Sequence, residues 1–302
     1  MTWRKLLFGG LAGFGIWQYA RQRQYNNRVS LKNKVVLITG ASSGIGRSAA
    51  RIFAAQGSHL VLVARRANVL AEVQNALLAE FDVRVLTVAG DITQGDDVQQ
   101  IVKAVMDQFG HLDVLVNNAG ILNGGYLDDH PFDEWERILT TNLNGTIRLT
   151  HAFLPLFKAQ RSGYIVNVSS VSAFIGKPGQ AVYVASKLGL NGFSETLRHE
   201  LFDYGVQVSV VMPTLTATPM IDSQQEAVPQ DALSQLFLTV ESPDYVASHI
   251  VATVRYNKKT VILGGIVLRA INWLYRLAPD VMDLIYHKIL NTHDLVTGSR
   301  HT

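Results

Sequence analysis

The sequence predicts an α/β protein built on a doubly wound, parallel sheet of about seven strands flanked by helices. Short apolar runs rich in β-branched residues alternate along the chain with longer segments of helical periodicity. Of the 302 residues, 48% are hydrophobic and 17% are charged, which allows one large domain with a full core and gives no sign of bulk disorder. No internal repeat, low-complexity tract or interdomain linker interrupts the alternation.

The apolar runs are each short enough to be a strand buried on both faces, as in a parallel sheet. They occupy residues 35–39, 60–64, 84–88, 114–117, 164–168, 206–211 and 260–263. The segments with helical periodicity lie between them, at residues 46–56, 69–80, 96–109, 132–159 and 181–204. This succession is the βαβ rhythm of a doubly wound sheet.

Composition excludes several kinds of site. The chain has no cysteine, so disulfides, thiolate metal ligands and a cysteine nucleophile are excluded. The nine histidines are scattered, and no pair has metal-ligand spacing beside a carboxylate, so we expect no metal. Residues 1–71 contain eleven Arg and Lys and no Asp or Glu. This basic pole suits anionic lipid headgroups or a phosphorylated cofactor; no nucleic acid is expected, because no recognised binding module appears.

The first predicted strand runs directly into TGASSGIG at residues 39–46. Glycines where a strand turns into a helix allow a tight turn and let a pyrophosphate approach the backbone at the helix amino terminus. A glycine-rich turn without a ligand is the alternative, since the spacing G-x3-G-x-G differs from the commoner G-x-G-x-x-G. The expected cofactor contacts in this loop are Gly40, Ser42, Ser43, Gly44, Ile45 and Gly46.

Arg65 and Arg66 directly follow the second predicted strand, about twenty positions after the glycines. An acidic residue there would hold the ribose hydroxyls of NAD and repel a 2′-phosphate, whereas two guanidinium groups favour NADP(H). The alternative is a solvated arginine pair that ends a strand. The sequence therefore predicts NADP(H) as the cofactor.

Several motifs, in order, resemble the short-chain dehydrogenase/reductase family in its compact single-domain form, over about residues 32–263. They are TGASSGIG, the GDI at 90–92, NNAG at 117–120, TNLNG at 141–145, the VSS that ends at Ser170, the pair Tyr183 and Lys187, and MPTLTATPM from Met212. The resemblance implies a Rossmann-type fold, a homodimer or homotetramer, and the active-site residues Asn142, Ser170, Tyr183 and Lys187. It further implies that Asp91 and Ile92 flank the adenine, that Asn118, Ala119 and Gly120 support the ribose side, and that Pro213, Thr216 and Thr218 hold the nicotinamide end.

The spacing of Tyr183 and Lys187 has a chemical interpretation, because positions i and i+4 lie on the same face of a helix. Isolated, such a pair is more often a half-buried aromatic beside a solvated charge. With the family motifs present, we expect Lys187, together with the oxidised nicotinamide, to lower the pKa of Tyr183 in the alcohol-oxidising direction. In the reducing direction the same tyrosine would donate its proton to the substrate oxygen. Ser170 would hydrogen-bond that oxygen, and Asn142 would position a water that links Lys187 to solvent.

One position departs from the family pattern. The usual proline-glycine after the sixth strand is here Pro213-Thr214, which removes a backbone freedom close to the nicotinamide. We expect local remodelling of this loop, with a substrate lid at residues 219–240 as the main source of selectivity. Gly124, Gly125 and Tyr126 are expected on the opposite rim.

Both ends of the chain extend beyond the family core. Residues 6–20 form an uncharged, mostly apolar run with basic residues on both sides. As a helix this run would measure about 22 Å, short of the roughly 30 Å of a bilayer core. It could be a secretory signal, a short anchor, or a helix that lies in the interface or packs on the domain; we favour an anchor or interfacial helix that leaves the catalytic domain facing the cytosol.

The segment from Gly264 predicts two amphipathic helices split at Pro279, which either cover a core or subunit interface or contact a membrane. The predicted organisation is therefore an apolar helix with its basic flank at 1–28, a dehydrogenase domain at 29–263 and an amphipathic extension at 264–302.

These features together predict a membrane-associated, NADP(H)-dependent oxidoreductase that interconverts a hydroxyl and a carbonyl group on a small apolar substrate such as a lipid, steroid or retinoid. One alternative is a soluble-type 3-oxoacyl reductase in which the terminal segments serve only assembly. Another is a nucleotide-binding regulatory protein without turnover, against which the complete set of four active-site residues argues.

Overall fold

The computed structural model describes residues 28–174, 176, 179–222 and 240–265, and positions 274, 275, 277, 278, 280, 281 and 284. Its centre is a parallel sheet of seven strands in the order β3-β2-β1-β4-β5-β6-β7. The strands are β1 (Val35–Thr39), β2 (His59–Ala64), β3 (Val85–Ala89), β4 (Val114–Asn117), β5 (Gly163–Val168), β6 (Val206–Met212) and β7 (Thr260–Ile262). The predicted doubly wound, Rossmann-type fold is confirmed.

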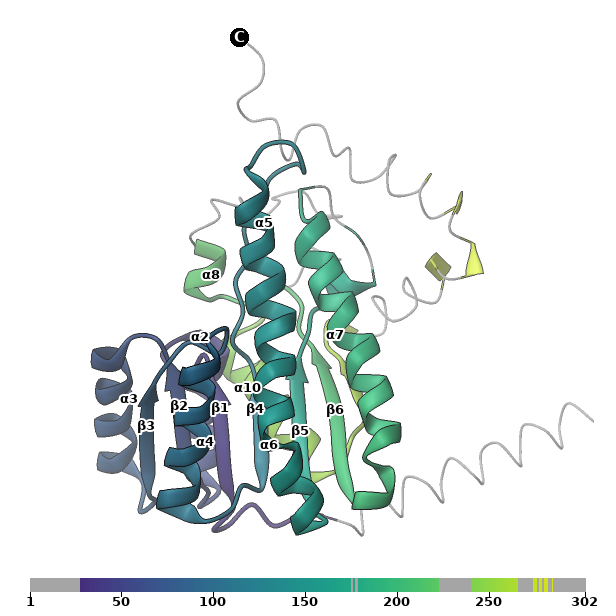
Figure 1. Cartoon of the computed structure of the whole chain (residues 1–302). Coiled ribbons are helices and arrows are strands. Elements are labelled where there is room, and N and C mark those ends of the chain that lie inside the picture. The colour runs from purple at the N-terminus through teal and green to yellow at the C-terminus, as the bar shows by residue number, and fades with distance from the viewer. Residues whose placement is uncertain are drawn as a thin grey trace, which may run out of the picture.

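Helices cover both faces of the sheet (Figure 1). One layer contains α2 (Gly44–Ala55), α3 (Ala67–Glu80) and α10 (Pro243–Arg255), and the other contains α4 (Gly95–Phe109), α6 (Thr146–Gln160) and α7 (Ala181–Glu200). The shorter elements are α5 (Phe132–Leu139), η1 (Thr140–Gly145), η2 (Val171–Ala173), η3 (Phe202–Tyr204) and α8 (Pro219–Asp222).

The strand β1 shows why apolar runs form the centre of this sheet. All five of its residues are buried, because alternate side chains enter the two cores. Val36 and Ile38 pack with Phe53 of α2, whereas Val35 and Leu37 pack in the core beneath α4, α6 and α7. An unbroken apolar strand therefore needs a helical layer on each face.

The segment 132–159, predicted as one helix, has an irregular centre. The helix α5 continues into the π-helical turn η1, which continues into α6. A π-helical turn accommodates one extra residue within a helix, and such turns are frequent at functional sites. Here it contains Asn142, which is fully buried.

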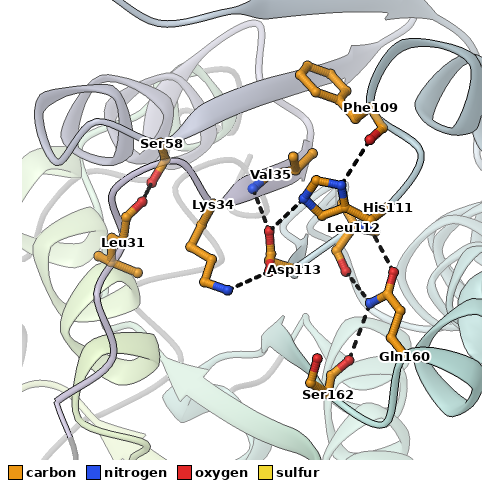
Figure 2. Close-up of polar contacts among 10 residues, drawn as sticks. All are labelled: Leu31, Lys34, Val35, Ser58, Phe109, His111, Leu112, Asp113, Gln160 and Ser162. Carbon is orange, nitrogen blue, oxygen red and sulfur yellow. Dashed lines mark hydrogen bonds and ion pairs between the residues drawn. The ribbon is translucent and has the colours of Figure 1, made fainter.

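At the amino ends of the strands, the carboxylate of Asp113 joins β1 to β4 (Figure 2). It accepts hydrogen bonds from Lys34 Nζ at 2.7 Å and from the backbone N–H of Val35 at 2.8 Å, and His111 Nε2 lies 3.3 Å away. Gln160 at the end of α6 donates to the Leu112 carbonyl at 2.9 Å. These contacts lie at the amino ends of the strands. The carboxyl ends, where parallel sheets bind ligands, remain available for a site.

Three sequence predictions concern residues that the structure does not describe. The apolar run 6–20 lies outside the described residues, as do most of the expected lid, of which α8 and Val240 are described, and most of the extension from 264. Within the part of the chain that is described, no helix is both long enough and apolar enough to cross a membrane. The proposed division at residues 28 and 263 therefore stays a prediction.

Candidate active site

A cavity of about 550 Å³ lies at the carboxyl ends of the central strands. Parallel sheets bind ligands at this edge, where the strand order reverses between β1 and β4. The structure brings nearly all of the predicted site residues to the cavity wall. These are Gly40, Ser42, Ser43, Gly44, Ile45, Arg65, Arg66, Asp91, Ile92, Asn118, Ala119, Gly120, Ser170, Tyr183, Lys187, Pro213, Thr216 and Thr218. Gly46 and Asn142 lie behind this wall.

The glycine loop has no room for larger side chains. A Cβ on Gly46 would lie 2.3 Å from the carbonyl oxygen of Gly40, closer than real Cβ contacts. Gly40 and Gly44 have positive φ values of 66° and 50°. The helix α2 then begins without a side-chain cap and without an acidic residue in its first turn. Its amino-terminal N–H groups can therefore bind an anion such as a pyrophosphate.

The two arginines after β2 differ in how they are held. Arg66 donates a hydrogen bond to Ser42 Oγ at 3.2 Å, which directs its guanidinium group toward the glycine loop. The Arg65 side chain is 73% exposed, and its Nη1 lies 4.0 Å from a carboxylate oxygen of Asp91. Arg66 is thus the better preorganised of the two for a phosphate.

Tyr183 and Lys187 lie on α7 and face the end of β5, as the spacing predicts. Lys187 is 5% exposed, and its Nζ donates to the carbonyl of Val168 at 3.0 Å. That Nζ lies 5.7 Å from the centre of the Tyr183 ring. Ser170 is the N-cap of η2, and its Oγ accepts a hydrogen bond from the Ser172 N–H at 3.1 Å. Its side chain also hydrogen-bonds Tyr183.

In the protein without cofactor, burial has the largest influence on the pKa values of Tyr183 and Lys187. Burial raises the pKa of Tyr183 to about 12, and the hydrogen bond with Ser170 lowers it only in part. Burial also lowers the pKa of Lys187, to about 8. The cause is the same for both residues, because each charged form loses its hydration on burial.

Asn142 is held in η1 immediately behind the Gly120 turn. Its side chain exchanges two hydrogen bonds with the backbone of Ile121, accepting from the N–H at 2.8 Å and donating to the carbonyl at 2.9 Å. A Cβ on Gly120 would lie 3.2 Å from Asn142 Oδ1 and 3.5 Å from Lys187 Nζ. Glycine at 120 thus lets Asn142 and Lys187 lie on either side of one backbone turn.

Sequence reasoning missed the role of Thr39. Its Oγ1 accepts hydrogen bonds from the N–H groups of Asn118 and Ala119, each at 3.0 Å, and donates to the carbonyl of Val116 at 3.4 Å. This hydroxyl shapes the turn after β4 from the end of β1. The signal was a single polar residue at the end of a strand that is otherwise apolar.

One expectation about the substrate end is corrected. Gly124, Gly125 and Tyr126 do not line the cavity; Ile121 and Leu122 do. Gly125 instead donates to the Gly179 carbonyl at 2.9 Å, which joins this loop to the segment before α7.

Thr214, which replaces a glycine of the family pattern, lines the cavity. Among the described residues, the non-glycine positions with positive φ are Asn33, Arg161 and Asn257. Thr214 therefore adopts a conformation that any residue can adopt, and its substitution causes no backbone strain here.

Comparison with known proteins identifies the family. A family model described as short chain dehydrogenase matches residues 34–229. The chain belongs to the short-chain dehydrogenase/reductase family. It is 34% identical over 279 residues to a bovine dehydrogenase/reductase SDR family member 7B, covering 89% of this chain and 83% of that one. It is also 34% identical over 232 residues to a 3-oxoacyl-(acyl-carrier-protein) reductase of Staphylococcus epidermidis, covering 77% and 95%.

Two solved reductase structures have a similar fold. Levodione reductase superposes with a TM-score of 0.73 at 26% identity, covering 79% of this chain and 99% of that one. A 3-ketoacyl-(acyl-carrier-protein) reductase from Brucella melitensis, solved with NADH, has a TM-score of 0.71 at 28% identity, covering 78% and 98%. The protein is an oxidoreductase that acts on CH–OH groups and uses a nicotinamide cofactor.

The residues of the cavity fit such a cofactor. The glycine loop and the uncapped start of α2 can hold its pyrophosphate, and the turn formed by Asn118, Ala119 and Gly120 approaches the same space. The far end contains Tyr183 and Lys187, so the cavity runs from an anion-binding end to a proton-exchanging end.

Replacing Lys187 with methionine tests the buried ammonium group. Between about pH 8 and pH 10.5, the unfolded wild-type protein binds more protons at this lysine than the folded protein does, because the pKa falls from 10.5 to about 8 on folding. This lysine's contribution to the free energy of unfolding should therefore rise by roughly 3 kcal/mol across that range. Lys187→Met should lack the rise, measured by urea unfolding at successive pH values.

The matched control is Lys103→Met, whose side chain is 76% exposed on α4. Because this variant retains Lys187, its free energy of unfolding should rise with pH as that of the wild type does. Parallel curves for the wild type and Lys187→Met would show that the lysine is not titrated differently in the folded state.

Proposed function

We propose that this enzyme is an NADP(H)-dependent reductase or dehydrogenase that interconverts a hydroxyl and a carbonyl group on a small apolar substrate. The observation that carries the proposal is the convergence of Tyr183, Lys187 and Ser170 at one end of the cavity, with two arginines at the other. NADPH, when bound, supplies the hydride. The protein must then supply a proton, a support for the substrate oxygen and a pocket that excludes water.

In the reducing direction, Tyr183 donates its hydroxyl proton to the substrate oxygen. A pKa of about 12 keeps the buried hydroxyl protonated near neutral pH, which suits a proton donor. Ser170, already hydrogen-bonded to Tyr183, stabilises the oxygen on which negative charge develops. Lys187 stabilises the phenolate that remains, and Asn142 positions a water through which the proton is replaced.

In the oxidising direction Tyr183 must accept a proton as phenolate, and its raised pKa opposes formation of the phenolate. Phenolate would be favoured by the positive charge that oxidised NADP brings into the cavity, whereas burial alone does not favour it. We therefore expect oxidation of an alcohol to be favoured at alkaline pH and reduction of a carbonyl near neutrality.

The substrate side of the cavity favours an apolar molecule. Its wall includes the side chains of Ile121, Leu122, Val171, Leu215, Met220 and Ile221. Apolar walls with a few placed polar groups are typical of small-molecule sites. A 3-oxoacyl thioester is the second candidate, favoured by the 34% identity to the Staphylococcus reductase over 95% of its length.

Replacing Tyr183 with phenylalanine removes the proposed proton donor and leaves the ring. Turnover should fall by several orders of magnitude while the Kd for NADPH stays within about twofold, since the hydroxyl acts in the transition state. NADPH oxidation with a medium-chain aldehyde, an aromatic diketone and a 3-oxoacyl thioester measures the first quantity, and fluorescence titration measures the second.

The control is Tyr204→Phe, because Lys158 Nζ lies 4.9 Å from the Tyr204 ring, in a second tyrosine–lysine pair outside the cavity. It should retain wild-type turnover. Substantial turnover by Tyr183→Phe would contradict the assigned proton donor.

The cofactor assignment is tested at the second strand. Arg66→Ala should weaken NADPH binding by about 2 kcal/mol, roughly thirtyfold, because a preorganised guanidinium group contacts the phosphate. NADH binding should change by less than about twofold, and Arg65→Asp should weaken NADPH binding and improve NADH binding. Isothermal titration of each variant with both cofactors gives the comparison.

Arg51→Ala serves as the control, because Arg51 pairs with Glu80 on the surface and lies outside the cavity. A wild-type preference for NADH, or an equal loss of both cofactors in Arg66→Ala, would contradict selection by the 2′-phosphate.

We further propose that the chain associates with a membrane through residues 1–27 and that the catalytic domain faces the cytosol. Support comes from the apolar run 6–20 and its basic flanks. Deleting residues 1–27 should move the protein from the membrane fraction to the high-speed supernatant without changing its Kd for NADPH. The first described backbone contact, from Val29 N–H to the Arg255 carbonyl at 2.9 Å, survives that deletion. Full-length protein found in the supernatant without detergent would contradict the proposal.

A further inference from the structure

A buried serine on α7 connects the two helical segments of the site. Ser186 is fully buried, and its Oγ donates to the Tyr183 carbonyl at 2.6 Å. The same Oγ accepts a hydrogen bond from Asn142 Nδ2 at 3.1 Å. One hydroxyl therefore joins the π-helical turn η1 to the turn of α7 that carries Tyr183 and Lys187.

This connection differs in kind from the other hydrogen bonds of Asn142. Those to the Ile121 backbone fix the side chain relative to the loop after β4. The bond to Ser186 fixes it relative to α7. Because a π-helical turn is rare and competes with the ordinary α-helical register, η1 needs tertiary contacts to stay in place. A return to that register would rotate Asn142 away from both partners, since successive residues are about 100° apart around a helix.

We propose that Ser186 is a positioning residue of the hydride-transfer site, which holds η1 and thereby Asn142 in register with Tyr183 and Lys187. The proposal rests on the proposed function, because it assigns Ser186 a role through Asn142. Ser186 itself does not line the cavity. Its effect on catalysis therefore passes through the residue that it holds.

The same helix offers a matched control. Ser194, two turns further along α7, is also fully buried and donates to the Leu190 carbonyl at 2.6 Å. Its Oγ accepts a hydrogen bond from Asn167 Nδ2 at 2.7 Å, on β5. Neither Ser194 nor Asn167 lines the cavity. The two serines thus share helix, burial and bonding pattern, and differ in whether their asparagine belongs to the site.

The experiment compares Ser186→Ala with Ser194→Ala in the full-length enzyme. Both should lose similar stability in urea, because each leaves an asparagine N–H without its acceptor. Ser186→Ala alone should lower kcat, by about tenfold or more, with KM for NADPH within about twofold. It alone should also increase hydrogen exchange of residues 140–146 in the protein without cofactor.

A double-mutant cycle separates positioning from general weakening. If Ser186 acts through Asn142, Ser186→Ala should lower kcat no further once Asn142→Ala is present. Ser194→Ala should have the same small effect in both backgrounds. Ser186→Cys keeps the side-chain size but makes weaker hydrogen bonds, so its kcat should lie between those of the wild type and Ser186→Ala. If Ser186→Ala does not fold, Ser186→Cys replaces it in the double-mutant cycle with Asn142→Ala and tests the same coupling.

Equal effects of Ser186→Ala and Ser194→Ala on kcat, or independent effects of Ser186→Ala and Asn142→Ala, would overturn the proposal. Tyr183→Phe distinguishes this failure from failure of the proposed function. An inactive Tyr183→Phe together with an unaffected Ser186→Ala removes only the positioning role. An active Tyr183→Phe removes the assigned chemistry, and with it the role of Ser186.

Discussion

The arrangement of this site depends on the burial of one positive charge, the ammonium group of Lys187. A charge taken out of water must be surrounded by acceptors, or it loses its proton. The carbonyl of Val168, the last residue of β5, provides such an acceptor. Gly120 leaves room for the same ammonium group, because a side chain at this position would approach Lys187 Nζ. The sheet edge and the glycine turn together create the space in which a lysine can be buried.

The two ends of the cavity meet different physical demands. The cofactor end is rigid, since Gly46 packs against the Gly40 carbonyl and Thr39 fixes the neighbouring turn through its hydroxyl. The substrate end is built from segments after β4 and β6, whose wall residues are mainly apolar. Within one family, substrate preference can therefore vary while the cofactor cradle keeps its geometry.

Sequence predicted the features that follow from local periodicity or from backbone freedom. Strands buried on both faces must be apolar throughout, so β1 was evident from VVLIT, and the glycine loop was evident from its place after that strand. The π-helical turn η1 was missed because the segment around it keeps a helical periodicity. The contact between Ser186 and Asn142 and the raised pKa of Tyr183 both depend on which groups are buried together, which no single segment specifies.

The first and last residues of the described domain lie at opposite ends of the strands. The direction in which the cavity faces therefore depends on which end of the domain is attached to a support such as a membrane. Val29 bonds to the end of α10 beside the amino ends of the strands, and Leu31 is held there by Ser58 (Figure 2). Leu263, by contrast, donates to the Met212 carbonyl at the edge that contains the cavity. Attachment through residue 28 therefore orients the cavity mouth away from the support, toward freely diffusing molecules. Attachment through residue 265 places the support beside the mouth, so that molecules dissolved in it reach the cavity without crossing water.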